Sequence, residues 1–219
     1  MAYSVPVVED IRNHFRFLKA RQDYVVDKSG CLMLEIIGAT FIANEEMIFG
    51  TVNKDYVQRE LQWYNSMSRN VNDIPGGAPK EWIRCADKDG MINSNYGWMI
   101  WSSENHNQYE NVKNELVNNP SSRRAIMIYT RPEIWNEYNT NGMSDFICTN
   151  SVQYFIREGE LVAVVQMRSN DSHFGYRNDK AFQDAVHQKL ALDLHVEVGS
   201  MIWHAGSLHI YERNFKLIT

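Results

Sequence analysis

The chain has 219 residues, of which 44% are hydrophobic and 22% charged, and its formal net charge is −5 at pH 7. This balance is typical of a globular protein and excludes intrinsic disorder or a fibre as its main state. The acidic charge argues against a protein that coats nucleic acid, although a few well-placed arginines can still hold a small anion. No apolar run approaches the ~20 residues that a bilayer span requires, and residues 1–10 lack the pattern of a signal peptide.

Apolar residues recur at helical spacing over residues 8–18, which predicts an amphipathic helix near the N-terminus. A turn at 27–30 and a short apolar strand at 32–37 are expected next. Residues 55–66 favour a second helix, and residues 73–80, with two prolines and two glycines, favour a loop. The apolar face of the second helix is expected to carry Val57, Leu61 and Tyr64.

Residues 109–118 predict a third helix, which Pro120 would end. The apolar residues 125–129 are interpreted as a buried strand. Two β-rich runs, 151–157 and 161–168, are separated by three residues that include a glycine, so they predict a hairpin with a three-residue loop.

Residues 179–194 again place apolar side chains in helical register, and residues 200–215 return to a strand-like composition. We see no internal repeat, low-complexity segment or linker. Strands and helices mix without strict βαβ alternation, so we expect one α+β domain over residues 1–219 rather than a doubly wound α/β fold.

The three cysteines, Cys31, Cys85 and Cys148, are odd in number and widely spaced. This pattern predicts neither a disulfide framework nor a zinc site, and we expect no bound metal. Free thiols are typical of a reducing cytoplasm, where we expect the protein to be located.

Cys148 stands just before the predicted hairpin. Taken alone, such a cysteine is most often a small buried hydrophobe. A functional thiol would need a nearby cation that favours the thiolate, and Arg168, at the end of the paired strand, is a candidate.

Two polar stretches can be interpreted in two ways. Ser122-Arg123-Arg124 is either a solvated surface pair of arginines or a loop that presents them to a phosphate. Arg168-Ser169-Asn170-Asp171 is either a polar turn or a binding loop at a strand end.

Two further residues have a structural interpretation when they are considered alone. Asp179 stands at the predicted start of a helix, where an aspartate commonly caps free N–H groups, and on the residues alone we favour that role. His209 alternates with apolar residues, and a lone strand histidine is more often structural than catalytic.

The order of these motifs along the chain changes this interpretation. The chain resembles the thymidylate synthase superfamily in Glu60-Leu61-Gln62-Trp63, Asn95-Tyr96-Gly97, Ser122-Arg123-Arg124, Cys148 followed by Gln153, Arg168-Ser169-Asn170-Asp171, and Ser207-Leu208-His209-Ile210-Tyr211. The resemblance covers nearly the whole chain from Asp27 onward. Residues 26–28, 35–39, 92–98, 129–132 and 142–146 resemble one branch, the deoxycytidylate hydroxymethylases of large phages.

The resemblance implies a thymidylate synthase-like fold with a curved mixed β-sheet, one face of which forms a homodimer interface. It also implies a thiol, Cys148, that adds to C6 of a pyrimidine nucleotide. C5 then attacks the one-carbon unit of 5,10-methylenetetrahydrofolate, and loss of the C5 proton and of tetrahydrofolate leaves an exocyclic methylene. In the synthases hydride reduces this group, whereas in the hydroxymethylases water adds to it. The branch therefore implies 5-hydroxymethylation of dCMP.

The resemblance assigns the phosphate to five residues. Arg168 and Ser169 would bind it within one subunit, with Arg168 also favouring the thiolate. Lys28 stands where the synthases use an arginine, so it supplies charge without the bidentate fork. Arg123 and Arg124 would reach across from the other subunit, which implies an obligate homodimer.

Further roles follow from the same resemblance. Glu60 would organise water and proton transfers, and Tyr96 would lie near the C5 proton. His209 and Tyr211 would contact the sugar. The folate-side positions are Trp82, Asp171 and Gly175.

The resemblance assigns the selection of the base to Asp179, because the synthases have an asparagine at this position. A carboxylate can accept from the N4 amino group of cytosine, and one proton shared with N3 would complete a second contact. Against uracil, an ionised carboxylate would face O4, which is also an acceptor. The resemblance therefore implies that Asp179 selects cytosine and, by protonating N3, assists the addition of Cys148.

The chain also departs from the general synthase pattern. Ile147 and Thr149 flank Cys148 where proline and histidine are usual, Cys85 replaces a tryptophan, and Asn178 replaces an aromatic residue. Two alternatives stay open at this point: methylation of dCMP or dUMP through the same intermediate, and a catalytically silent nucleotide-binding relative. Retention of Cys148, Glu60 and Arg168 argues against the silent relative.

Overall fold

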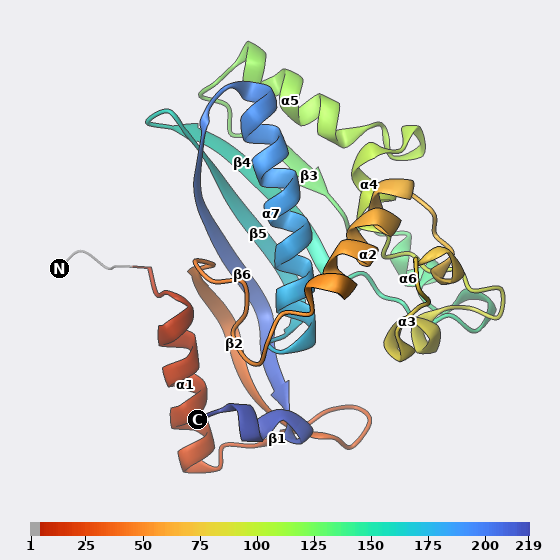
Figure 1. Ribbon diagram of the computed structural model, residues 1–219, viewed down its shortest axis with the longest axis vertical. Helices are drawn as coiled ribbons and strands as arrows, with labels where there is room; N and C mark the ends of the chain where they lie inside the picture. Colours follow the sequence, from red (N-terminus) through yellow and green to blue (C-terminus); the bar gives the residue numbers. More distant parts are fainter. Residues whose placement is uncertain (1–4) are drawn as a thin grey trace. The chain divides into compact units, whose positions relative to one another are not determined.

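The computed structural model describes residues 5–219, which form two compact units (Figure 1). Unit 1 comprises the described chain up to Val52 together with Tyr154–Thr219, and unit 2 comprises Asn53–Gln153. Over residues 5–219, none of the helices combines the length and the apolar character needed to cross a bilayer.

Six strands form one sheet in the order β1-β2-β6-β5-β4-β3. The strands are β1 (Val25–Val26), β2 (Leu32–Ile42), β3 (Ile126–Ile128), β4 (Thr149–Arg157), β5 (Glu160–Asp171) and β6 (Glu197–Tyr211). β2 runs antiparallel to β6, whereas β5 and β6 run parallel and are connected through helix α7 (Phe174–Leu194). The sheet is therefore mixed, which confirms the predicted α+β class.

In unit 1, helix α1 (Val8–Arg21) packs against β2, and α7 packs against β5 and β6 (Figure 1). α1 buries Val8, Ile11 and Phe15 on one face, which confirms the predicted N-terminal helix. The core between α7 and the two central strands consists of alternate strand residues and one helix face, including Leu161, Ala163, Val165, Met167, Trp203, Ala205, Phe182, Val186 and Leu190.

The hairpin between β4 and β5 is tighter than predicted. Its turn consists of Glu158 and Gly159, with φ of 53° and 85°, and not of three residues. Two consecutive positive φ angles are typical of a type I′ turn, whose twist matches that of the flanking strands.

Helix α7 begins at Phe174, one and a half turns before the predicted start. The side chain of Asp171 accepts hydrogen bonds from the N–H groups of His173, at 2.7 Å, and Phe174, at 3.4 Å. Asp179 consequently lies within the helix, and its interpretation as a cap is wrong. At the C-terminus, β6 ends at Tyr211 and a 3₁₀ helix covers Glu212–Leu217, so the strand-like composition of 200–215 overestimates the strand.

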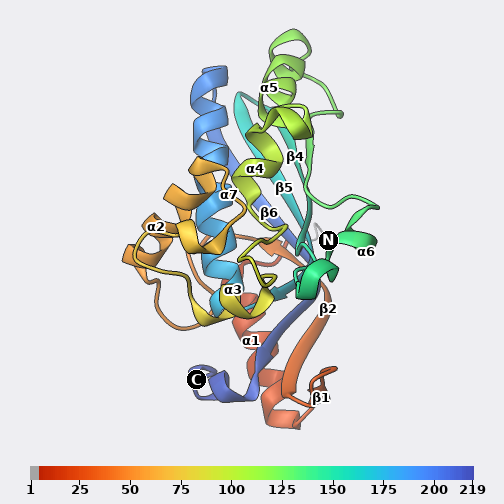
Figure 2. The same ribbon diagram turned by 90° about the vertical axis from the view of Figure 1, so that its right-hand side faces the viewer.

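Unit 2 is mainly helical (Figure 2). Its helices are α2 (Lys54–Ser66), α3 (Lys80–Cys85), α4 (Tyr96–Trp101), α5 (Gln108–Asn118) and α6 (Ile134–Glu137). The predicted buried face of α2 is only partly correct. Tyr64 is buried, but its fully buried companions are Glu60 and Trp63, while Val57 and Leu61 are half-buried. A polar residue, Glu60, therefore occupies the interior face.

β3 is an edge strand of the sheet. Ala125, Met127 and Tyr129 are buried, but Ile128 is 54% exposed. The prediction of a buried strand is thus only partly correct, because the side chains alternate between the core and the surface as in a sheet with one covered face.

Candidate active site

Unit 2 brings two of the predicted site residues together around a buried carboxylate. Glu60, on α2, is 4% exposed, and its Oε1 accepts hydrogen bonds from Tyr56 Oη at 2.5 Å and Trp82 Nε1 at 2.9 Å. Trp82 Nε1 also lies 3.1 Å from Tyr56 Oη. Burial and the Glu60 carboxylate raise the pKa of Tyr56, so its hydroxyl stays protonated and donates to Glu60.

Tyr96 is held in an aromatic cluster at the start of α4. Its ring stacks on Tyr64 at a centroid distance of 5.3 Å and meets Tyr129 edge-on, also at 5.3 Å. The next residue, Gly97, approaches the backbone of α2 so closely that a Cβ would lie 1.8 Å from Tyr64 O. Asn95 caps α4 by accepting from Trp98 N at 2.8 Å. Packing and helix capping therefore explain Asn95 and Gly97 in this motif, independently of the predicted role of Tyr96 near the C5 proton.

Cys148 lies directly before β4 and is half-buried. Its neighbours Ile147 and Thr149 are fully buried, whereas Cys148 itself is not. The Sγ atom lies 3.9 Å from the carbonyl oxygen of Phe146. Cys148 is therefore half-buried, whereas a small hydrophobe of the core would be fully buried.

Arg123 and Arg124 both lie exposed just before β3. The Arg124 guanidinium pairs with Glu115, with Nη2 3.1 Å from Oε1. The backbone of Arg123 is fixed, because its carbonyl oxygen accepts from Gln153 Nε2 at 2.8 Å. Their loop can therefore present two guanidinium groups to a ligand outside the subunit.

In unit 1, the ends of β5 and β6 carry five predicted site residues: Arg168, Ser169, Asp171, His209 and Tyr211. The strands pair in parallel, with Ser169 opposite Ser207 and Asp171 opposite His209. The rings of His209 and Tyr211 are 5.2 Å apart. Burial lowers the pKa of His209, and the nearby Asp171 carboxylate opposes that shift in part. Neutral imidazole can serve as a hydrogen-bond donor and acceptor at one strand end.

The turn that carries Lys28 lies beside the same strand end. Asp27 Oδ1 accepts from the backbone N–H of Ser29 at 2.8 Å and of Cys31 at 2.9 Å, which fixes the turn. The Asp27 carboxylate contributes to raising the pKa of Tyr211, after the larger effect of burial. Lys28 itself is exposed, so its ammonium group is available to an anion at this strand end.

Asp179 lies on α7 and meets the same end of β5. The amide Nδ2 of Asn170 donates to Asp179 Oδ2 at 2.7 Å. Gly175 lies against this pair, since a Cβ there would be 3.1 Å from Asn170 Nδ2 and 3.6 Å from Asp179 Oδ2. Arg168, two residues before Asn170, is exposed.

The predicted residues therefore fall into two sets. Unit 1 gathers Lys28, Arg168, Ser169, Asp171, Gly175, Asp179, His209 and Tyr211, and unit 2 holds Glu60, Trp82, Tyr96, Arg123, Arg124 and Cys148. Two contacting residues were missed. Tyr56 could have been found from its i, i+4 spacing to Glu60 on a helix, whereas nothing in the sequence pairs Asn170 with Asp179, because their contact depends on how α7 packs.

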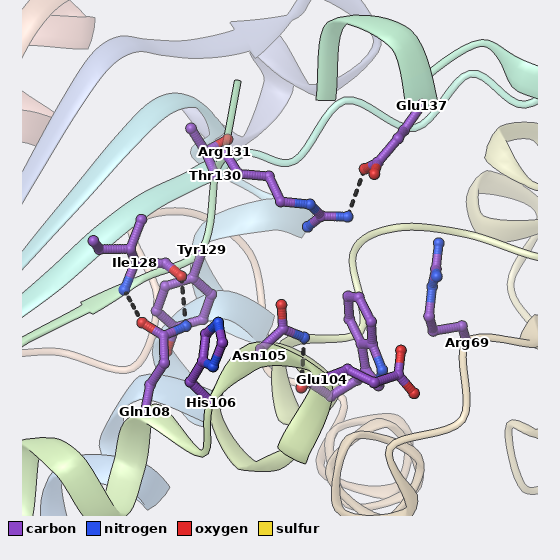
Figure 3. Close-up of a pocket in the computed structure, with 11 residues that line it drawn as sticks. Arg69, Glu104, Asn105, His106, Gln108, Ile128, Tyr129, Thr130, Arg131 and Glu137 are labelled. Atoms are coloured by element: carbon purple, nitrogen blue, oxygen red, sulfur yellow. Dashed lines mark hydrogen bonds and ion pairs between the residues drawn. The ribbon is translucent and has the colours of Figure 1, made fainter. Parts of the chain in front are cut away.

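A separate pocket of about 640 Å³ lies in unit 2 (Figure 3). Two arginines contact the Trp98 ring, with Arg69 Cζ 4.5 Å and Arg131 Cζ 5.5 Å from its centroid. Glu137 pairs with Arg131 at 2.5 Å, and Glu104 also lines the pocket, so the formal charges cancel. No predicted site residue lines it, and no cluster of three or more metal-ligating side chains occurs within residues 5–219.

Comparison with known proteins places this geometry in a family. The thymidylate synthase family model matches residues 49–219. The chain is 53% identical over 218 residues to the deoxycytidylate 5-hydroxymethyltransferases of Enterobacteria phages T4 and T2, covering 96% of this chain and 89% of each relative. It is 28% identical to the thymidylate synthase of Corynebacterium aurimucosum over 88% of this chain and 74% of that protein. The solved structure of thermostable thymidylate synthase A from Bacillus subtilis superposes with a TM-score of 0.72 at 22% identity, over 94% of this chain and 81% of that one.

Proposed function

Because the chain belongs to the thymidylate synthase family, we propose that it is a deoxycytidylate 5-hydroxymethyltransferase. The overall reaction converts dCMP, 5,10-methylenetetrahydrofolate and water into 5-hydroxymethyl-dCMP and tetrahydrofolate. The observation that carries the proposal is the 53% identity, over 96% of the chain, to phage enzymes that bear this name.

Cys148 is the proposed nucleophile. Its thiolate adds to C6 of the cytosine ring, and the electron pair moves to C5, which becomes able to attack a one-carbon electrophile. Once the one-carbon unit is bonded to C5, C5 loses its proton and tetrahydrofolate leaves, so an exocyclic methylene remains. Water then adds to this methylene and gives up a proton, the C5–C6 double bond forms again, and the Cys148 thiolate leaves C6. The half-buried position of Cys148 between two buried neighbours supports this role, because the residue is not sealed in the core while both its neighbours are anchored there.

Glu60 is the proposed organiser of water and proton transfers. Tyr56 and Trp82 donate to the same carboxylate oxygen, which fixes the carboxylate plane and directs Oε2 away from these two donors. A carboxylate held in this way can orient a water for addition to the methylene. Tyr96 is proposed to act near the C5 proton.

The phosphate is proposed to bind to cations and a hydroxyl: Lys28, Arg168 and Ser169, with Arg123 and Arg124 from the second subunit. The exposure of all four basic side chains supports this assignment, because an exposed cation can meet an external anion; Arg124 would share its charge between that anion and Glu115. His209 and Tyr211 are proposed to contact the sugar.

We propose that the functional molecule is a homodimer that associates through one face of the sheet. Two exposed apolar side chains on strands of unit 1 support this arrangement: Ile37, 74% exposed, and Val198, 50% exposed. A contiguous exposed apolar patch marks an interaction surface, and these two side chains would contribute to such a patch on the sheet.

The proposed folate residues fit the chemistry of a pterin. Trp82 offers an aromatic face, Asp171 a carboxylate that can accept from pterin N–H groups, and Gly175 a position without a side chain. The bound 5,10-methylenetetrahydrofolate supplies the one-carbon unit that is transferred. These residues are proposed to hold the pterin ring and to leave access for the water that the final step requires.

The folate product tests the proposal. Incubation of the protein with dCMP and 5,10-methylenetetrahydrofolate should release tetrahydrofolate, while methyl transfer would release dihydrofolate, since the folate would then also supply hydride. Cys148→Ala is the matched control and should release neither. Dihydrofolate formation, or turnover that persists in Cys148→Ala, would contradict the proposed reaction.

A further inference from the structure

Asn170 is the buried neighbour of the proposed base-selecting carboxylate. It lies one residue before the end of β5 and is 2% exposed. Its Nδ2 donates to Asp179 Oδ2 at 2.7 Å. Gly175 packs against this pair, since a Cβ there would lie 3.1 Å from Asn170 Nδ2, which is a tight contact.

The other half of the Asn170 amide is not satisfied. Its Oδ1 is buried and has no hydrogen-bond partner among the described residues. A buried acceptor without a partner destabilises a fold, and an apolar residue of the same size would avoid that loss. The hydrogen bond that the amide donates to Asp179 therefore explains why an asparagine occupies this buried position.

That bond determines how the Asp179 carboxyl group is used. A neutral carboxyl group accepts a hydrogen bond best through its carbonyl oxygen, so the amide N–H on Oδ2 directs any bound proton to Oδ1. It also fixes the plane of the carboxyl group against rotation. A proton shared with a cytosine N3 would then be carried by one defined oxygen in one defined direction.

We propose that Asn170 is a positioning residue for base selection, which holds Oδ2 of Asp179 so that Oδ1 exchanges the proton with the base. This inference rests on the proposed function, because it assumes that Asp179 contacts the base. Asn170 acts through Asp179 and does not itself touch the nucleotide.

The first test replaces the amide by an apolar group of similar volume. Asn170→Leu removes a buried unsatisfied acceptor and also the donor to Asp179, so its two effects on the thermal midpoint oppose each other. In the folded variant, the ratio of kcat/KM for dCMP to that for dUMP should fall at least tenfold. Asn214→Leu is the control, since Asn214 is also buried and its Nδ2 also lacks a partner among the described residues. Its ratio should equal that of the unchanged protein.

The second test keeps the shape and reverses the hydrogen bond. Asn170→Asp places a carboxylate against Asp179, so the two groups must share a proton, and the pH profile of kcat/KM for dCMP should gain an ionisation. In an Asp179→Ala background, Asn170→Leu should leave the dCMP to dUMP ratio unchanged, because the residue through which it acts is absent.

Three results would overturn the inference: an unchanged ratio in Asn170→Leu, an unchanged pH profile in Asn170→Asp, or equal effects of Asn170→Leu with and without Asp179. If the proposed function itself were wrong, the unchanged protein would not convert dCMP at all, which distinguishes that outcome from the three results above.

Discussion

At the scale of single residues, the proposed base selection depends on the carboxyl group of Asp179. Asp179 presents carboxylate oxygens where an asparagine would present one acceptor and one donor. A hydrogen bond to a charged group contributes about 1.5–3 kcal/mol. The loss of one such bond, together with a repulsion against uracil O4, is enough for discrimination of about two orders of magnitude.

Asp179→Asn should therefore shift the preference from dCMP toward dUMP. The asparagine can still accept from Asn170 through its carbonyl oxygen, so the neighbouring structure is retained. The measurement is kcat/KM for both nucleotides, and the ratio should fall by about 100-fold. An unchanged preference for dCMP in a folded variant would remove Asp179 from base selection.

At the scale of elements, His187 connects helix α7 to strand β5. Its Nε2 lies 2.6 Å from the carbonyl oxygen of Leu161, and burial lowers its pKa below the ordinary value of 6.5. The folded protein therefore holds a neutral imidazole that donates to Leu161. As the pH falls below 6.5, the unfolded chain binds a proton that the folded chain resists, so the free energy of unfolding decreases.

His187→Gln should weaken this pH dependence, because the glutamine amide can donate to Leu161 without titrating. The free energy of unfolding, measured with urea at about pH 7.5 and about pH 5.5, should change less in the variant than in the unchanged protein. An identical change in the two proteins would show that His187 does not contribute.

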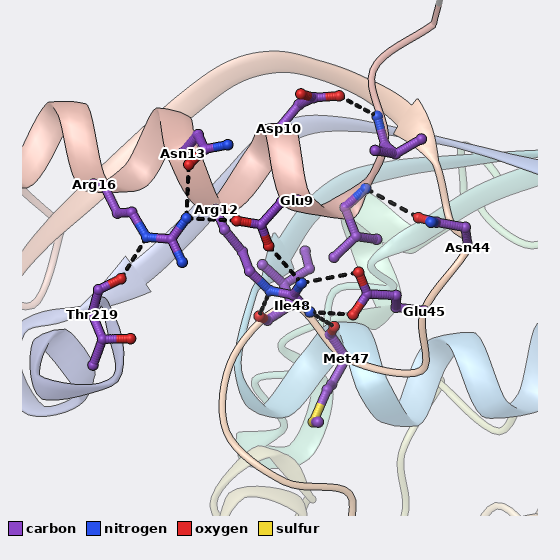
Figure 4. Close-up of polar contacts among 12 residues, drawn as sticks. Glu9, Asp10, Arg12, Asn13, Arg16, Asn44, Glu45, Met47, Ile48 and Thr219 are labelled. Carbon is purple, nitrogen blue, oxygen red and sulfur yellow. Dashed lines mark hydrogen bonds and ion pairs between the residues drawn. The ribbon is translucent and has the colours of Figure 1, made fainter.

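The side chain of Arg12 links helix α1 to the loop after β2 (Figure 4). Its guanidinium pairs with Glu45 at 2.6 Å and Glu9 at 2.9 Å, and donates to the backbone oxygens of Ile48 at 2.7 Å and Met47 at 2.9 Å. Because this side chain is mostly buried, its hydrogen bonds are shielded from water.

Arg12→Met should lower the free energy of unfolding by about 2–3 kcal/mol. Arg16→Met is the control: Arg16 pairs with Glu9 on the same helix but is more exposed, so its loss should cost less than about 1 kcal/mol. Equal losses in urea denaturation would contradict a special role for the Arg12 network.

The elements themselves were largely predictable from the sequence, because periodicity reports which side of an element is apolar. α2 and α5 were placed to within one residue at each end, and α1 begins where predicted but extends three residues further, to Arg21. The errors have tertiary causes. The start of α7 was placed at Asp179 because Arg177-Asn178-Asp179 has the composition of a helix start, whereas the hydrogen bonds of Asp171 begin the helix earlier.

The site residues were predictable only through the resemblance. No periodicity distinguishes Cys148 from a core cysteine or His209 from a structural histidine. The Asn170–Asp179 contact escapes sequence reasoning altogether, since nine residues and a helix start separate the partners and only packing brings them together.

At the scale of the whole molecule, the proposed mechanism requires two subunits to complete one site, because Arg123 and Arg124 would come from the partner subunit. A Cys148→Ala chain and a chain with Arg123→Ala and Arg124→Ala should each be inactive as homodimers. A heterodimer isolated through two different affinity tags has one site with both an intact thiol and intact arginines. It should therefore recover about half of the unchanged activity.

An inactive heterodimer would contradict the exchange of arginines between subunits. Activity in the arginine-deficient homodimer would do so as well, since it would show that these side chains are not required.

The most direct test of the central claim is the mass of the nucleotide product after incubation with dCMP and 5,10-methylenetetrahydrofolate. We expect the mass of the nucleotide to increase by one CH₂O unit, because water adds to the exocyclic methylene. A gain of one CH₂ unit would mean that the methylene is reduced and would contradict hydroxymethyl transfer, and no gain would contradict the assignment of dCMP as substrate.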